Sequence, residues 1–258
     1  MEILSSRRRR EEIIRLATTS GLAGVTDLSE KFGVSASTIR RDLARLESEG
    51  HLARTYGGAI AANTQAELTL RQRVGEAYEE KLAIARWAAD QIAPNDTAFL
   101  DAGSTVAAVA HQLRARSGLT ITTTSLTVLN ELARSDHLTV NCLGGTLRPI
   151  SQGFVGPIAE SALDTITFDR AFLGADSVDA QLGICEADPH QTRLKQLAAR
   201  RARHTYVLAH AKKLGRRPFH AWAQLPHPWT LVTTAQDDAV QAFRTSGVTV
   251  VTLPANAT

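Results

Sequence analysis

A short run near residue 100 carries the groups that could bind a phosphate. Phe99-Leu100 ends an expected strand, and Asp101-Ala-Gly-Ser-Thr105 follows it directly before an Ala- and Val-rich stretch. Gly103 would allow a tight turn, and Ser104 and Thr105 would supply hydroxyls where a helix begins. The N–H groups at the start of a helix, together with its dipole, favour an anion such as phosphate. Because Gly-Ser-Thr is also an ordinary N-cap sequence, the prediction needs support from other segments.

Three further strand ends carry small or hydroxyl residues and provide that support. The candidate effector-binding residues in them are Thr123, Thr124, Ser125, Gly144, Gly145, Gly174 and Asp176. In open α/β sheets ligands gather at the carboxyl ends of the strands. The segment 189–236 contains no Asp or Glu, and Lys213 stands in it just after an expected strand, where it can contact an anion. The histidines lack the spacing of metal ligands, so we expect no metal site and no cofactor.

A second group of residues, near position 40, could bind DNA. Ile39, Leu43 and Leu46 recur at helical spacing and predict a buried stripe. Small hydroxyls at the start of such a helix allow close approach to a major groove, and arginines can reach phosphates or guanine edges. The candidate DNA-binding residues are Ser35, Ser37, Thr38, Arg40, Arg41 and Arg45 on the helix, and Arg54, Tyr56 and Gly57 in a wing beyond it.

Charge supports DNA binding by its placement rather than by its amount. The whole chain has 29 Lys and Arg against 26 Asp and Glu, a net charge of +3. Residues 1–60 hold ten basic and eight acidic residues, and Arg7 to Arg10 form a cluster within them. A plain three-helix bundle with a solvated charged face would show the same balance. The arginine-bearing helix, the short turn before it and the Gly-Gly wing together favour a DNA-binding unit.

The spacing of apolar residues predicts two kinds of structure along the chain. Residues 1–60 hold three short helices and then a small hairpin around Gly57-Gly58. The second helix is expected to begin at Asp27 as its N-cap, with Glu30 completing a capping box. Residues 61–78 are polar and form a linker. Residues 79–258 alternate strands and helices, which predicts an α/β domain with a largely parallel sheet and helices on both faces.

Composition excludes several classes of protein. Hydrophobic residues make up 43% and charged residues 21% of the 258 positions, which is ordinary for a globular chain. No run of 18 apolar residues exists, so we expect no membrane span. Near the N-terminus arginines are followed by glutamates rather than by the apolar segment of a secretory signal. Cys142 and Cys185 lack a CxxC spacing and suit a reducing compartment, so we expect a cytoplasmic protein.

The stretch Val25–Ala59 resembles the winged helix-turn-helix of the DeoR family of bacterial transcriptional regulators. Its core Ser-Ala-Ser-Thr-Ile-Arg-Arg-Asp-Leu and its terminal Arg-Thr-Tyr-Gly-Gly-Ala carry the likeness. Residues from about 80 to 251 resemble the effector domain of the same family, which is related in fold to ribose-5-phosphate isomerase and binds phosphorylated sugars. The matching elements are Asp101 to Thr105, Thr123 to Ser125, Gly144-Gly145, Phe172 to Asp176, Glu186 and Lys213 to Gly215.

The resemblance also implies roles for individual residues. Those that would face the operator are Ser37, Thr38, Arg40 and Arg41, with Arg54 in the wing. Those that would hold the phosphate are Gly103, Ser104 and Thr105. Those that would lie near the sugar hydroxyls are Asp101, Asp176 and Glu186.

Three positions depart from the family pattern. The family often has Asn where this chain has Thr124, usually has Glu at Gln191, and usually has Asp at His210. Carboxylates accept hydrogen bonds from sugar hydroxyls and repel anions. We therefore hypothesise an effector more anionic than a simple sugar monophosphate, or weak effector binding.

Three functions fit these features, and we favour the first. It is a ligand-responsive repressor of carbohydrate-metabolism genes, a homodimer or homotetramer in which a bound phosphosugar alters the spacing of two DNA-binding units. The second is a sugar-phosphate isomerase-like enzyme with an appended N-terminal domain, for which Asp176 or Glu186 would be the general base. The segment Asp176-Ser-Val-Asp179 lacks the clustered acids expected there. The third is a phosphosugar-binding module whose first domain mediates only dimerisation.

Overall fold

A computed structural model describes residues 6–20, 23–48, 52–55, 58–61 and 67–255 of the chain. It divides into two compact units, Met1–Leu68 and Thr69–Thr258. Each unit has its own buried core and is described by itself. Within the described residues no helix is both long and apolar enough to cross a membrane.

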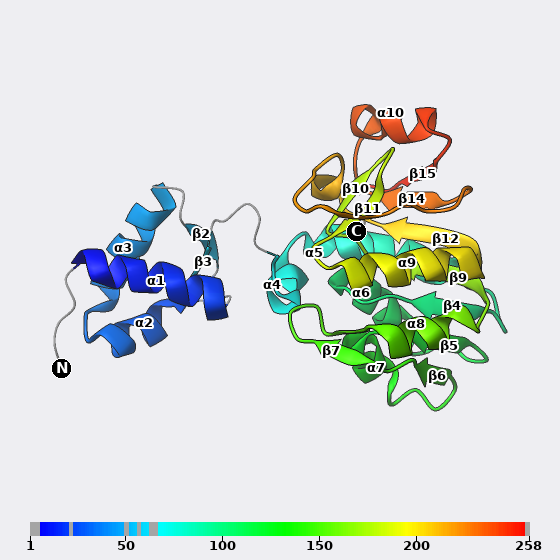
Figure 1. The fold of residues 1–258 in the computed structure, drawn as a ribbon, viewed down its shortest axis with the longest axis horizontal. Helices are drawn as coiled ribbons and strands as arrows, with labels where there is room; N and C mark the ends of the chain where they lie inside the picture. The colour runs from blue at the N-terminus through cyan, green and yellow to red at the C-terminus, as the bar shows by residue number, and fades with distance from the viewer. Residues whose placement is uncertain (1–5, 21–22, 49–51, 56–57, 62–66, 256–258) are drawn as a thin grey trace. The chain divides into compact units, whose positions relative to one another are not determined.

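The first unit consists of three helices and a small antiparallel sheet (Figure 1). Its elements are α1 (Ser6–Ser20), β1 (Ala23–Gly24), α2 (Val25–Phe32), α3 (Ala36–Ser48), β2 (Leu52–Thr55) and β3 (Gly58–Ala61). The sheet order is β1-β3-β2, and β2 pairs with β3 as the expected hairpin. The predicted stripe of Ile39, Leu43 and Leu46 is buried against Ile13, Leu28 and Phe32. The three-helix prediction with a wing is therefore confirmed.

The start of α2 differs from the prediction. The helix begins at Val25, its N-cap is Gly24, and no side chain caps it, so Asp27 lies inside the first turn. A carboxylate there still favours the helix because it faces the positive end of the helix dipole. Gly33 ends the helix in the left-handed conformation, with φ of 61°. Strand β1 was not expected, because two residues carry no periodic pattern.

The second unit is built on a seven-stranded sheet in which every neighbouring pair is parallel. Its order is β15-β14-β12-β9-β4-β5-β6. The strands are β4 (Thr97–Leu100), β5 (Thr120–Thr123), β6 (Thr139–Cys142), β9 (Phe168–Leu173), β12 (Ala202–Leu208), β14 (Thr230–Thr233) and β15 (Thr249–Thr252). The predicted parallel sheet is confirmed, and the carboxyl ends of β4 and β9 lie side by side at its centre.

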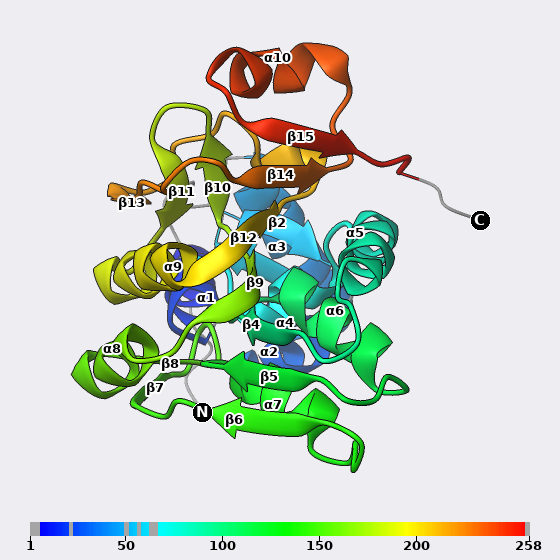
Figure 2. The same cartoon turned by 90° about the vertical axis from the view of Figure 1, so that its right-hand side faces the viewer.

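Helices cover both faces of this sheet. They are α5 (Tyr78–Asp90), α6 (Ser104–Leu113), α7 (Leu126–Leu132), α8 (Pro157–Asp164), α9 (Pro189–Arg201) and α10 (Asp237–Thr245). Figure 2 shows α5 and α6 on one side of the strands and α8 and α9 on the other. Two separate apolar clusters match these two faces, one with Ile84 and Val109, the other with Leu163 and Leu197.

Several short elements were not predicted. They are α4 (Leu70–Gly75), β7 (Thr146–Arg148), β8 (Gly153–Val155), β10 (Ser177–Asp179), β11 (Gly183–Glu186), β13 (Ala221–Ala223) and the 3₁₀ turn Ala211–Lys213. Helix α4 falls within the stretch 61–78 that we expected to be a linker, and the second unit begins at Thr69. Elements this short depend on contacts made elsewhere in the fold, so their own sequence predicts them poorly.

Candidate functional site

A small pocket lies at the carboxyl ends of the central strands, where the sequence predicted one. Its walls are made by Arg73, Ala102, Gly103, Ser104, Thr105, Ser151, Gly174, Ala175, Glu186, Gln191 and Lys213. Six of these were predicted, namely Gly103, Ser104, Thr105, Gly174, Glu186 and Lys213. We call this cavity the effector pocket.

The start of α6 forms the part of the effector pocket suited to an anion. Gly103 has φ of 146° and ψ of 157°, a conformation that residues with a side chain rarely adopt. This turn lets α6 begin at Ser104, and both Ser104 and Thr105 line the pocket. The first N–H groups of a helix have no partner within it. The pocket therefore offers backbone donors and two hydroxyls to an oxyanion.

A buried charge cluster lies at the edge of this pocket. The Lys195 ammonium, 1% exposed, donates to Asp101 Oδ2 and lies 3.1 Å from Glu186 Oε1. Asp101 Oδ2 also accepts the Gly174 N–H at 3.0 Å. Asp101 is 4% exposed and is not part of the pocket wall, so its contact with a sugar hydroxyl stays a prediction. Its carboxylate joins the ends of β4 and β9 and holds Lys195.

Burial sets the protonation of this cluster. Desolvation raises the pKa of Glu186 to about 8, with Lys195 opposing the shift and Asp176 adding to it. Burial would lower the pKa of Lys195, but the carboxylates of Asp101 and Glu186 raise it overall. At neutral pH Lys195 and Asp101 therefore form the charged pair. Glu186 then carries a proton and presents a neutral carboxylic acid to the pocket.

Two cationic side chains complete the pocket wall. Arg73 comes from α4, and its Nη1 donates to Asp176 Oδ1 at 2.7 Å. Lys213 Nζ donates to the carbonyl of Ala175, and burial lowers its pKa while Asp176 opposes the shift. Asp176 pairs with Arg73 and does not line the pocket, so its contact with a sugar hydroxyl stays a prediction. Arg73 and Lys213 are thus the charges that an anion would meet.

Two of the predicted hydroxyls at the end of β5 and just after it form hydrogen bonds with nearby backbone groups. Thr123 Oγ1 donates to the carbonyl of Leu100 at 2.6 Å, and Ser125 Oγ accepts the Val128 N–H at 3.2 Å as the N-cap of α7. Thr124 is 1% exposed. None of the three lines the effector pocket. In this structure Thr123 holds the strand and Ser125 starts the helix, and the assignment of the three residues as effector ligands stays a prediction.

The glycine pair after β6 is also structural. Gly144 and Gly145 have φ of 67° and 111°, and neither lines the effector pocket. A Cβ at Gly145 would lie 2.7 Å from the carbonyl oxygen of Val155. Close packing of the turn before β7 against β8 therefore requires glycine at position 145, and the contact of this pair with an effector stays a prediction.

Two positions that depart from the family pattern lie in or near the pocket. Gln191 lines it and is 6% exposed, and its Oε1 has no hydrogen-bond partner among the described residues. His210 is 1% exposed, and neither ring nitrogen has a partner within the described part of the chain. Burial, with the nearby charges of Lys213 and Lys81, lowers the pKa of His210 to about 3. His210 is therefore neutral.

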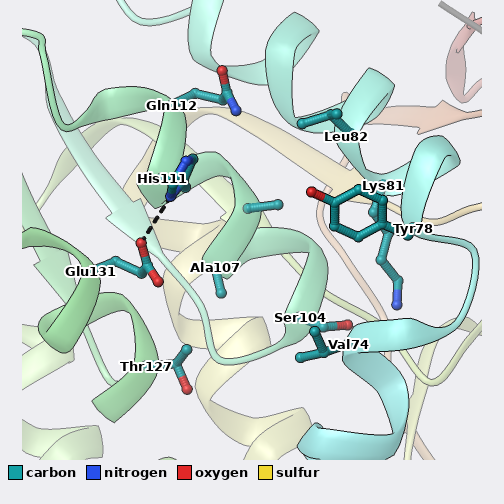
Figure 3. Close-up of a pocket in the computed structure, with 11 residues that line it drawn as sticks. Val74, Tyr78, Lys81, Leu82, Ser104, Ala107, His111, Gln112, Thr127 and Glu131 are labelled. Atoms are coloured by element: carbon teal, nitrogen blue, oxygen red, sulfur yellow. Dashed lines mark hydrogen bonds and ion pairs between the residues drawn. The ribbon is translucent and has the colours of Figure 1, made fainter.

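A larger pocket of about 230 Å³ lies between α4, α5, α6 and α7. In Figure 3 the ring of Tyr78 and the side chain of Gln112 stand on opposite sides of it. Lys81 extends from α5 toward Ser104 and Val74. Ser104 also lines the effector pocket, so the two cavities share a wall.

Helix α3 presents the predicted polar face in the first unit. Ser37, Arg40 and Arg41 are exposed, as is Arg45, and Thr38 is half-buried. Ser35 stands just before the helix, and its Oγ accepts the Thr38 N–H at 3.3 Å. The exposed hydroxyl of Ser35 therefore caps α3, and its role as a DNA contact stays a prediction.

Part of the expected basic cluster at residues 7–10 is structural. Arg9 is 5% exposed, and its Nε donates to Asp42 Oδ2 at 2.6 Å, while Arg10 lies 3.4 Å from Asp42 Oδ1. These contacts tie α1 to α3. The backbone of Arg54 lies in β2, and its side chain, together with Tyr56 and Gly57, falls outside the described residues.

Two family models match the chain. The model described as DeoR-like helix-turn-helix domain matches residues 9–65, and the DeoR C terminal sensor domain matches residues 76–235. Three relatives are similar over most of their length. The HTH-type transcriptional regulator GlpR of Haloferax volcanii is 34% identical, over 94% of this chain and 96% of that one. The lactose phosphotransferase system repressor of Streptococcus mutans is 32% identical over 89% and 92%. The glycerol-3-phosphate regulon repressor of Escherichia coli is 33% identical over 81% and 82%.

Solved structures show more distant similarity. The sorbitol operon regulator SorC of Klebsiella pneumoniae is 13% identical, covering 81% of this chain and 90% of its own, with a TM-score of 0.38. Ribose 5-phosphate isomerase of Methanocaldococcus jannaschii is 20% identical over 52% and 53%, with a TM-score of 0.39. Likeness at this level carries no argument about activity.

Proposed function

The chain belongs to the DeoR family of transcriptional regulators, and from this premise we propose that it represses carbohydrate-metabolism genes under the control of a phosphorylated sugar. Family membership makes it a DNA-binding regulator with a sensor unit. The proposal adds the ligand, the pocket that binds it and the response of operator binding. It also places the protein in the cytoplasm, where an operator is reached.

The observation that carries the proposal is the composition of the effector pocket. One wall has the start of α6 with the hydroxyls of Ser104 and Thr105, and the others bring Arg73 and Lys213. Backbone donors at a helix start together with two cations suit a phosphate. Gln191 and the protonated Glu186 add neutral polar groups that can bond to sugar hydroxyls. Phosphate and sugar recognition thus meet in one cavity.

The exposed face of α3 supports operator binding. Ser37, Arg40 and Arg41 are exposed on it while Ile39 and Leu43 anchor the helix in the core. A recognition helix of this kind reads the major groove with its N-terminal residues, and the arginines add phosphate contacts. Two such units in a homodimer or homotetramer would read two half-sites, and their spacing is the quantity that an effector can change.

The two other functions are less well supported. The relatives described above are transcriptional regulators over 81–94% of this chain, which gives no support to an isomerase with an appended domain. The match to a DeoR-like helix-turn-helix across residues 9–65 argues against a first unit that mediates only dimerisation.

The deciding experiment measures the electrophoretic mobility of a DNA fragment in the presence of the protein. A fragment from upstream of the protein's own gene is titrated with the purified full chain, with and without ribose 5-phosphate, fructose 1-phosphate, glycerol 3-phosphate and fructose 1,6-bisphosphate. We expect a retarded complex at low ionic strength that weakens steeply with salt, because phosphate contacts release counterions. We also expect one or more of the compounds to change its affinity. Absence of any retarded complex would contradict the operator function, and a complex indifferent to all of them would contradict the proposed effector.

A further inference from the structure

Arg73 and the short helix α4 connect the effector pocket to the start of the second unit. Thr69 is the first residue of that unit and directly follows Leu68, the last of the DNA-binding unit. Helix α4 begins at the next residue, Leu70, and Arg73 in it lines the effector pocket. A displacement of α4 would therefore act at once on the chain segment that leads to the DNA-binding unit.

Several contacts hold α4 in place. Thr69 and Gln72 form a reciprocal capping box, and the Leu70 N–H donates to the carbonyl of Ile150 at 2.8 Å. Arg73 pairs with Asp176 at 2.7 Å. Lys81 Nζ donates to the Arg73 carbonyl. A helix of six residues is not stable by itself, so its position depends on contacts such as these.

The effector pocket needs more room than it has. Its volume is about 10 Å³, enough for about one water molecule, whereas small-molecule pockets usually measure about 300–1,000 Å³. Lys195 and Glu186 are 1% and 3% exposed and joined to each other and to Asp101, so this side cannot yield easily. Another part of the wall is Arg73 of α4, a short helix whose position depends on contacts such as those described above.

Helix α4 also separates the effector pocket from the larger cavity. Arg73 lines the small pocket, Val74, the next residue, lines the cavity of about 230 Å³, and Ser104 belongs to both. Figure 3 shows Val74 and Ser104 close together in the wall of the larger cavity. Movement of α4 would join the two volumes around the start of α6. A displacement of α4 alone would therefore open enough space for a sugar phosphate.

Electrostatic attraction between Arg73 and a phosphate would favour that displacement. Arg73 is bound to the carboxylate of Asp176 and lies in the wall where a phosphate would bind. A phosphate carries about two negative charges and three acceptor oxygens, and a guanidinium binds it bidentately. We propose that Arg73 binds the anionic effector in exchange for Asp176, and that the resulting shift of α4 carries the occupancy of the pocket to the linker. The inference rests on the proposed effector function and adds the residue and helix that transmit it.

The test uses the full chain, the upstream DNA fragment and the four sugar and polyol phosphates named above. In the wild type, the compound that binds tightest should change amide hydrogen exchange in residues 67–76. Arg73→Gln should weaken its binding at least about tenfold, and should lose both the exchange response and the change in operator affinity. Arg71→Gln is the matched control, because Arg71 is exposed on the same helix and loses the same charge. It should leave all three measurements unchanged.

Two results would overturn the inference. One is a saturated wild type with no change of exchange in residues 67–76. The other is a folded Arg73→Gln protein with wild-type affinity and wild-type operator response. If Arg73→Gln does not fold, the exchange measurement on the wild type decides alone. If the wild type binds operator but none of the four compounds, the proposed effector function is refuted, and this inference with it. If the wild type binds one of the compounds while hydrogen exchange in α4 stays unchanged, only this inference is refuted.

Discussion

Replacing Lys195 by methionine would remove the cation beneath the effector pocket. Lys195 is 1% exposed and its ammonium contacts Asp101 and Glu186. Because burial raises the pKa of Glu186 to about 8, Asp101 is the carboxylate whose charge Lys195 balances at neutral pH. Methionine fills a similar volume but leaves Asp101 charged, 4% exposed and without its cation. Removing one partner of a buried ion pair costs about 3–5 kcal/mol of the free energy of unfolding.

Thermal unfolding of the full chain would measure this loss. In a unit of this size each kcal/mol lowers Tm by about 2–4 °C, so the transition of the second unit should fall by about 6–20 °C. Arg200→Met on the same helix is the control, since Arg200 is exposed and its loss should leave Tm nearly unchanged. Circular dichroism at 222 nm reports both units, and the first unit should melt as in the wild type.

A second substitution separates charge from packing. Asp101→Asn in the Lys195→Met background removes the orphaned charge and keeps a side chain of the same shape. It should recover much of the lost stability, with a coupling energy of about 1–3 kcal/mol in a double-mutant cycle. The reasoning is refuted if Lys195→Met melts like Arg200→Met, or if the double variant is less stable than Lys195→Met alone.

Three further predictions concern binding. Arg40→Ala and Arg41→Ala should each weaken operator binding, and each lost phosphate contact should reduce the salt slope by about one; unchanged binding in both would refute the assignment of α3. Effector affinity should fall as pH rises through about 8, because Glu186 then loses its proton and adds a negative charge to the pocket, and calorimetry on Glu186→Gln should show a shallower fall. Combining Gln191→Glu with His210→Asp should shift preference from bisphosphorylated toward monophosphorylated sugars, and an unchanged preference would reject the more anionic effector.

The main elements were predictable because their signals are local and repeated. The strands at Thr97–Leu100 and Thr230–Thr233 are short, mostly buried runs, and α9 shows buried residues at helical spacing. Parallel pairing then follows from the alternation of strands and helices. It also places the start of α6 at the sheet edge, which is why Gly103, Ser104 and Thr105 were found together in the pocket.

Arg73 and Lys195 were missed for different reasons. Arg73 lies in a polar stretch whose helix is defined by its contacts with Asp176 and Ile150, more than 70 residues away in sequence. Lys195 had a usable signal, because it lies on the same face of α9 as Leu194 and Ala198, which are buried. A lysine on a buried face implies a buried carboxylate partner. The sequence alone does not say which one, since Asp101 is 94 positions away.

The hydroxyls after β5 show where pattern reasoning reaches its limit. Thr123 and Ser125 have the same residue types as Ser104 and Thr105 and, like them, lie where a strand leads into a helix. Their hydroxyls bond to nearby backbone, Thr123 to Leu100 and Ser125 to Val128, whereas Ser104 and Thr105 line the pocket. Ser and Thr can serve either purpose. Which of the two roles a hydroxyl takes depends on the path of the neighbouring strand, and this path is a property of the tertiary structure.

The charges around the effector pocket connect ligand type with the position of α4. Lys195 is balanced by Asp101, and Glu186 is neutral at pH 7, so the pocket presents Arg73 and Lys213. While Asp176 holds Arg73, their charges offset each other. When Arg73 turns to the ligand, its guanidinium lies next to the phosphate, and the Asp176 carboxylate remains near Lys213. A more negative effector gains more from that exchange than a weakly charged one, so the ligands that bind this pocket best should also be those that displace α4 most completely.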